Sequence, residues 1–145
     1  MTVVHTSTLA ELDPATLYAI LRLRNEVFVV EQECVYLDLD GRDLEPTAKQ
    51  LWISQGDEVV ATLRWLRDPD GSARIGRVAT APSARGSGLA GELMRQALTL
   101  SEGSEVVLDA QSYLVDWYGS FGFAAAGPEY LEDGIPHVPM RLVRE

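Results

Sequence analysis

A glycine-containing segment in the second half of the chain has the composition of an anion-binding loop. It reads Arg85-Gly86-Ser87-Gly88-Leu89-Ala90-Gly91 and leads into a run with helical periodicity. Backbone N–H groups at a helix N-terminus attract anions, and small residues let phosphate oxygens approach the backbone. The segment therefore predicts a phosphate-binding loop. The expected contacts come from Arg85, Gly86, Ser87, Gly88, Leu89 and Ala90.

Two other interpretations of this segment stay open. Residues 86–91 spell G-x-G-x-x-G and precede an acidic residue, Asp109, which is the pattern of a dinucleotide-binding fold. However, residues 81–85 separate the preceding strand from the glycines, and the 36 residues after Asp109 are too few for the strand–helix units of that fold. In the other interpretation the glycines serve only a tight turn and the entry to a helix.

A second segment, rich in aromatic residues, lies further along the chain. It reads Asp116-Trp117-Tyr118-Gly119-Ser120-Phe121-Gly122-Phe123. A tyrosine hydroxyl is protonated at neutral pH and can serve as a general acid. The alternative is that Tyr118 is a packed core aromatic.

The first element that must support these segments is a helix over residues 14–29. Asp13-Pro14 is a helix start, because the carboxylate caps free N–H groups and proline has no N–H to leave unpaired. Side chains at three- and four-residue spacing predict the face that packs on the rest of the protein. That face consists of Leu17, Ile20, Leu21, Leu23, Arg24, Val27 and Phe28.

The remaining segments predict an α+β domain with a mixed sheet. Apolar stretches separated by turn signals predict an antiparallel meander, and a helix and further strands follow the glycine segment. The expected strands are residues 50–55, 58–67, 73–80, 105–110, 123–127 and 137–143, and the expected later helices are 89–101 and 113–121. The length of 145 residues fits one domain covering residues 1–145.

Both motifs resemble those of the GNAT N-acetyltransferases. Arg85-x-x-Gly88-x-Ala90 resembles the Q/R-x-x-G-x-G/A pyrophosphate loop of that superfamily, and residues 116–123 resemble its FYxxxGF segment, with Trp117 in place of the usual Phe. Residues 24–32, 38–43 and 132–137 are similar to the ElaA-like branch, so the resemblance covers nearly the whole chain. It implies a mostly antiparallel sheet with helices on both faces and a splayed central strand pair.

The resemblance also implies acetyl transfer from acetyl-CoA to a primary amine of a small molecule or peptide by direct attack. The pantetheine arm is expected to bond the backbone of Val78 and Thr80, and the Val78 N–H to stabilise the oxyanion. Tyr118 corresponds to the family position that protonates the leaving thiolate. Gln111 either bonds the CoA arm or caps the next helix. A scaffold that binds CoA without catalysis is the alternative function.

The amine must lose a proton before it attacks, and the sequence offers three candidate bases. Glu26, Glu31 and His137 lie in the branch-specific segments, near the expected substrate side. Each also has a structural interpretation: an exposed helix charge for Glu26, a helix-end hydrogen bond for Glu31, and a hydrogen-bonded strand histidine for His137.

Composition limits the partners. Twelve Lys and Arg against 22 Asp and Glu give a net charge of -10, which argues against nucleic acid and anionic membranes. The acidic excess either suits a cationic or amine-bearing substrate or only keeps the protein soluble. One cysteine, Cys34, and two histidines are too few for a structural zinc site, so no metal is expected. The N-terminus lacks the layout of a signal peptide, and a cytoplasmic protein is expected. A homodimer is retained among the expected partners.

Overall fold

Three consecutive strands form one half of the sheet. In the computed structural model, which describes residues 2–143, β2 (Lys49–Gln55), β3 (Glu58–Arg67) and β4 (Ala73–Thr80) pair antiparallel in chain order. The turns between them contain Gly56 and Gly71, both with positive φ. The predicted meander is confirmed, and its boundaries lie within one residue of those expected.

The other strands complete a mixed sheet that has eight strands within residues 2–143. The order is β1-β2-β3-β4-β5-β8-β6, with β7 added to β8. The bounds of the new strands are β1 His5–Ser7, β5 Val106–Gln111, β6 Phe123–Ala125, β7 Tyr130–Glu132 and β8 Ile135–Leu142. Of these pairings, β4–β5 is parallel and the others are antiparallel. The predicted α+β class is confirmed, and the dinucleotide-fold interpretation is wrong because this sheet is not doubly wound.

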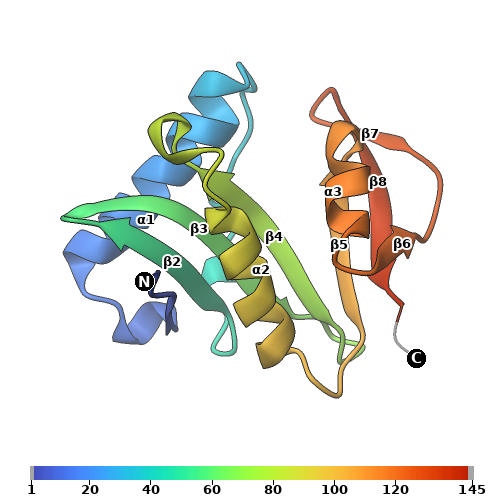
Figure 1. The fold of residues 1–145 in the computed structure, drawn as a ribbon, viewed down its shortest axis with the longest axis horizontal. Helices are drawn as coiled ribbons and strands as arrows, with labels where there is room; N and C mark the ends of the chain where they lie inside the picture. The colour runs from blue at the N-terminus through green and yellow to red at the C-terminus, as the bar shows by residue number, and fades with distance from the viewer. Residues whose placement is uncertain (1, 144–145) are drawn as a thin grey trace.

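The parallel pair β4–β5 stays together over two residues only. Its register consists of Ala73 opposite Val106 and Arg74 opposite Val107. Beyond these residues the two strands diverge, and Figure 1 shows them meeting at one end of the sheet and standing apart at the other. This is the splayed pair that the family resemblance implied.

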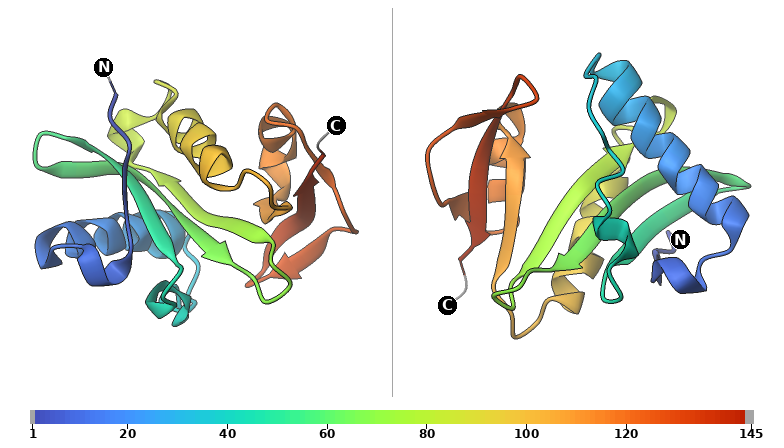
Figure 2. Two further views of the ribbon diagram at one scale, coloured as in Figure 1. Left: turned by 90° about the horizontal axis from the view of Figure 1, so that it is seen from below. Right: turned by 180° about the vertical axis from the view of Figure 1, so that it is seen from behind.

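Helices cover both faces of the sheet (Figure 2). The helix α1 (Pro14–Arg24) begins at Asp13, whose Oδ2 accepts a hydrogen bond from the Thr16 N–H at 3.0 Å. The predicted helix over 14–29 continues past Arg24 as a π-helical turn, η2 (Asn25–Glu31). The opposite face carries α2 (Leu89–Leu100) and α3 (Val115–Gly119). Short 3₁₀ turns are η1 Leu9–Glu11, η3 Arg42–Leu44, η4 Pro82–Ala84 and η5 Ser112–Leu114.

Apolar packing fixes α2 and α1 to the sheet. Leu93, Met94 and Ala97 of α2 are buried in the main core cluster, together with Leu63 and Ile75 of the central strands. On the other face Leu23, Val27 and Ala79 form a second cluster. Since α2 is attached along β2, β3 and β4, its N-terminus is held at the end where β4 and β5 diverge (Figure 1).

One residue of the predicted apolar stripe, Arg24, lies at the centre of a buried ion network. Its side chain is fully buried, with Nε 3.0 Å from Asp38 Oδ2 and Nη1 2.7 Å from Asp43 Oδ1. Asp43 also accepts a hydrogen bond from Gln50 Nε2 at 2.7 Å. Burial alone would raise the pKa of Asp43, but the bond from Arg24 and its charge lower it. The network ties α1 to the loop that precedes β2.

Arg64 of β3 extends the network toward solvent. It donates to both carboxylate oxygens of Asp40, at 2.8 and 3.0 Å, and approaches Asp43 Oδ2 at 3.4 Å. Burial would raise the pKa of Asp40, but the bonds from Arg64 and the Arg42 N–H lower it to about 2. The loop over residues 32–45 is therefore held by ion pairs to α1 and β3, although it contains only one short 3₁₀ turn.

We expect Arg24→Met to destabilise the protein by about 3–5 kcal/mol, because it takes the fully buried cation away from two buried carboxylates. Urea unfolding followed by circular dichroism measures this difference. The control is Arg22→Met: Arg22 is exposed and, within residues 2–143, forms an ion pair only with Glu26, so its loss should cost about 0.5 kcal/mol or less. Equal effects of the two substitutions would contradict the role assigned to the network.

Candidate functional site

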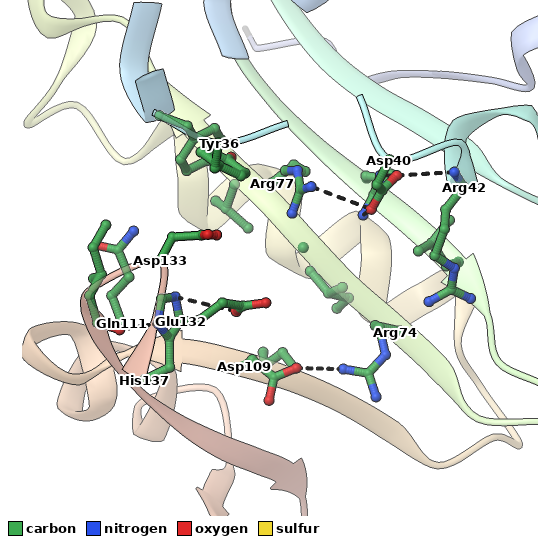
Figure 3. A pocket seen from close by; sticks show the side chains of 18 of the residues that line it. Tyr36, Asp40, Arg42, Arg74, Arg77, Asp109, Gln111, Glu132, Asp133 and His137 are labelled. Carbon is green, nitrogen blue, oxygen red and sulfur yellow. Dashed lines mark hydrogen bonds and ion pairs between the residues drawn. The ribbon is translucent and has the colours of Figure 1, made fainter. Parts of the chain in front are cut away.

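A cavity of about 950 Å³ occupies the gap between β4 and β5. One wall is the segment from Arg74 to Val78, and the opposite wall comes from β5, the β7–β8 hairpin and α3. The loop over residues 32–45 borders the cavity with Gln32, Tyr36 and Asp40. Figure 3 shows acidic side chains of the β5 and β7–β8 wall directed across the cavity toward the arginines of β4. The divergence of the two strands thus creates a polar space at the centre of the sheet.

A β-bulge in β4 lies on the wall of this cavity. Thr62 of β3 is opposite Ala79 and Arg64 is opposite Gly76, so Arg77 and Val78 together oppose the single residue Leu63. Arg77 has a left-handed backbone, with φ of +53°. Such bulges redirect the backbone and are frequent near active sites. Val78, the predicted oxyanion donor, therefore lies at the irregular point of the strand.

The predicted phosphate loop lies between η4 and α2, at the open end of the strand pair (Figure 1). Gly86 and Gly88 have φ of +88° and +79°, and a Cβ at either position would meet no atom within 4 Å. Gly88 is the N-cap of α2, so the N–H groups of Leu89 and Ala90 belong to the first turn and have no intrahelical acceptor. This open, positively polarised surface suits a pyrophosphate, whose oxygens accept such donors.

Arg85 and Glu31 form an ion pair that links this loop to η2. Arg85 Nη1 and Nη2 each lie 2.6 Å from a Glu31 carboxylate oxygen, and Arg85 Nε donates to the Thr80 carbonyl at 3.0 Å. The hydrogen bond from Arg85 lowers the pKa of Glu31. Glu31, predicted on the substrate side, thus contacts the glycine loop and does not line the cavity among the described residues.

Tyr118 lines the cavity from α3, and its ring is buried. The ring packs edge-on against Trp117, with centroids 4.9 Å apart, and against Phe123 at 6.4 Å. Its hydroxyl makes no hydrogen bond to any residue between 2 and 143. Burial raises the pKa of Tyr118, so the phenol stays protonated at neutral pH. A buried, protonated phenol that lines the same cavity as Val78 is compatible with both roles considered from the sequence, proton donor and packed core aromatic.

Gln111 and His137 are neighbours across the β5–β8 pair, and both line the cavity. Gln111 exchanges side-chain hydrogen bonds with Gln32 at 3.3 and 3.5 Å, which connects β5 to the loop after η2. His137 Nδ1 lies 2.7 Å from the Ile135 carbonyl oxygen, and Nε2 lies 4.0 Å from Glu132 Oε2. The third candidate base, Glu26, is not among the described residues that line the cavity. Its carboxylate accepts a hydrogen bond from Arg22 Nε.

The structure therefore brings together Val78, Gln111, Tyr118 and His137 in one cavity, and the glycine loop lies at the end of the sheet where β4 and β5 diverge. Sequence reasoning missed several polar side chains of the same cavity, including Arg77 and Tyr36. It also missed β7, although Asp133-Gly134, both with positive φ, is the usual two-residue turn of a β-hairpin. Among residues 2–143 no cluster of three or more His, Cys, Asp or Glu could hold a metal ion.

Comparison with known proteins decides the family. Residues 24–144 match the model of the acetyltransferase (GNAT) domain. The chain belongs to the GNAT acetyltransferase family. Protein ElaA of Escherichia coli is 40% identical over 137 residues, covering 90% of each chain. A UPF0039 protein of Mycobacterium tuberculosis is 46% identical over 134 residues, covering 90% of this chain and 86% of that protein.

Solved structures confirm the GNAT fold. An acyl-CoA N-acyltransferase from Pseudomonas aeruginosa superposes with a TM-score of 0.92 at 41% identity, over 99% of this chain and 100% of that one. E. coli ElaA also gives 0.92, at 37% identity and the same coverage. Family and fold both indicate an acyltransferase, and GNAT folds in general use acyl-CoA. No helix within residues 2–143 is long and apolar enough to cross a membrane.

Gly88 has a left-handed φ of +79°, so a residue with a Cβ is strained at this position even though the space around it is open. We expect Gly88→Ala to cost about 1–2 kcal/mol through backbone strain and to weaken CoA binding as well. Gly103→Ala is the matched control, because Gly103 has a φ of +82°, equally open surroundings and a position outside the loop. Urea unfolding should give similar losses for both, whereas calorimetric titration with CoA should show weaker binding only for Gly88→Ala. Equal CoA affinity in the two variants would contradict phosphate binding at the loop.

Proposed function

We propose that this GNAT domain transfers the acetyl group of acetyl-CoA to a primary amine of a small molecule or peptide by direct attack. The observation that carries the proposal is the gap between β4 and β5, which has an irregular strand on one side, a buried tyrosine on the other and a glycine loop at its open end. A thioester arm entering this gap would lie between Val78 and Tyr118, with its phosphates at residues 85–90.

The backbone supports the binding of the pantetheine arm. From Ile75 onward the β5-facing side of β4 has no strand partner, so an extended arm can add there as a further strand. Val78 and Thr80 are two residues apart and direct their backbone groups to the same side. In the proposed complex the Val78 N–H donates to the thioester oxygen as it becomes an oxyanion.

His137 is the base that we assign among the three candidates, because it lines the cavity and the two glutamates do not. With its Nδ1–H donated to the Ile135 carbonyl, a neutral His137 presents an unprotonated Nε2. That atom takes the proton of the amine as its nitrogen attacks the carbonyl carbon.

Tyr118 is assigned as the proton donor to the departing thiolate. The C–S bond breaks as the carbonyl re-forms, and the sulfur takes the phenolic proton. A raised tyrosine pKa makes donation harder, but a thiolate that shared the buried surroundings of the Tyr118 hydroxyl would also be a stronger base. The relative proton affinities of the two groups, rather than the tyrosine pKa alone, determine whether the transfer is favourable.

We expect acetyl-CoA to raise the melting temperature, because a ligand at about a hundred times its Kd stabilises the native state by roughly 2.7 kcal/mol. NAD should have no such effect. Thermal denaturation with each ligand makes the comparison, and a free-thiol assay with a panel of amines follows turnover. Stabilisation by NAD but not by acetyl-CoA would overturn the proposal. Stabilisation by acetyl-CoA without turnover on any amine would favour a CoA-binding module.

Tyr118→Phe separates proton donation from packing, since it removes the hydroxyl and keeps the ring. We expect kcat to fall by roughly 10²-fold, with little change in CoA affinity or stability. The control is Tyr113→Phe, because Tyr113 is exposed in η5 and does not line the cavity among the described residues. Steady-state kinetics of both variants is measured with an amine that the wild-type protein acetylates. An unchanged kcat in the Tyr118 variant would leave the residue with a packing role only.

A further inference from the structure

Arg77 has a backbone conformation that is unusual for its residue type. Its φ of +53° lies in the left-handed region, which residues with a Cβ seldom occupy, and it is the first of the two residues in the β4 bulge. Bulges with a left-handed first residue normally have glycine at that position. Because glycine would fit without strain, the arginine side chain must offset the cost of the conformation.

The side chain of Arg77 is held by the loop over residues 32–45. Its Nε lies 2.7 Å from Asp38 Oδ1, close enough for an ion pair although the N–H is not aligned for a hydrogen bond. Nη2 donates to the Asp38 carbonyl at 3.0 Å and lies 3.4 Å from Asp40 Oδ2. The guanidinium also lies over the Tyr36 ring, 5.7 Å from its centroid. The loop over residues 32–45, which is not part of the sheet, therefore holds the side chain of the first bulge residue.

The two aspartates that hold Arg77 are themselves held by other side chains. Asp38 is buried and bound by Arg24, and its Oδ1 accepts from the Tyr36 hydroxyl at 2.8 Å. Asp40 is bound by Arg64 through both oxygens. Figure 3 shows Arg77 directed toward Asp40 along the cavity edge, with Tyr36 beside it. A continuous set of ion pairs thus runs from α1 to the residue that precedes Val78.

We propose that Arg77 is a positioning residue: its attachment to Asp38 and Asp40 maintains the β4 bulge and so directs the Val78 N–H toward the acyl carbonyl. The inference rests on the proposed function, in which that N–H stabilises the oxyanion. In this role the guanidinium acts through the backbone, because its Nε and Nη2 lie against Asp38 and Asp40. This role predicts that substitutions of Arg77 lower kcat according to how well the new residue tolerates the left-handed backbone, so that glycine is less harmful than alanine.

The test compares Arg77→Ala with Arg77→Gly. Both lose the attachment, but alanine is strained at this φ and will relax the bulge, whereas glycine adopts the conformation freely. We expect kcat for Arg77→Ala to fall at least about tenfold, approaching the effect of losing an oxyanion donor. The kcat of Arg77→Gly should lie between that of Arg77→Ala and that of the wild type. The affinity for CoA should be nearly unchanged in both variants. The matched control is Arg67→Ala, because Arg67 also lies over an aromatic ring and bonds a backbone carbonyl, yet is in regular register outside the cavity.

A second measurement needs no turnover. In the amide NMR spectrum of the free protein, the Val78 resonance should move further in Arg77→Ala than in Arg77→Gly, and should stay in place in Arg67→Ala. Equal losses of kcat in the alanine and glycine variants would overturn the inference, as would losses no larger than that of Arg67→Ala. If Arg77→Ala does not fold, Arg77→Gln is judged by the same criteria. Failure of the proposed function would instead appear as a wild-type protein without acetyl transfer.

Discussion

The early separation of β4 and β5 is the constraint on which the rest of this structure depends. A parallel pair normally continues its hydrogen bonds along both strands, yet here the pairing ends after Arg74 and Val107. The bulge at Arg77 and Val78 lies just beyond, where increased twist carries β4 away from β5. Without this divergence the sheet would be continuous, and neither the cavity nor an unpaired strand edge facing β5 would exist.

The cavity that the divergence creates is bordered by the loop over residues 32–45, which has little regular structure. Buried ion pairs hold this loop in place. The loop over residues 32–45 has no strand or long helix to fix it, but Asp38 and Asp43 bind a fully buried arginine of α1. Removing these charges from water is costly, so the arrangement is favourable only because each carboxylate receives several donors. The same loop then contacts Arg77, so that the fold's polar core and its candidate active site share residues.

Local patterns in the sequence were sufficient to predict most elements, whereas long-range polar contacts were not predictable. Periodicity and turn residues gave the meander and α2 nearly residue for residue, because those signals act over neighbouring positions. Arg24 was expected on the buried face, but its partners lie 14 and 19 residues away in a segment without periodicity. The pairing of Glu31 with Arg85 spans 54 residues, which no local pattern encodes. The catalytic roles of Tyr118, Val78 and His137 stay predictions.

The two ends of the site are built from different kinds of groups, and this explains why the family assignment does not identify the acceptor. The end at which we propose that the cofactor binds consists mainly of backbone: glycines with positive φ, the first turn of α2 and the unpaired side of β4. Such groups tolerate many sequences, so they are compatible with a fold that serves many reactions. The other end consists of side chains from the loop over residues 32–45 and the β7–β8 hairpin. These side chains line the space that an acceptor would enter in the proposed function, so we expect acceptor selectivity to depend on these two segments.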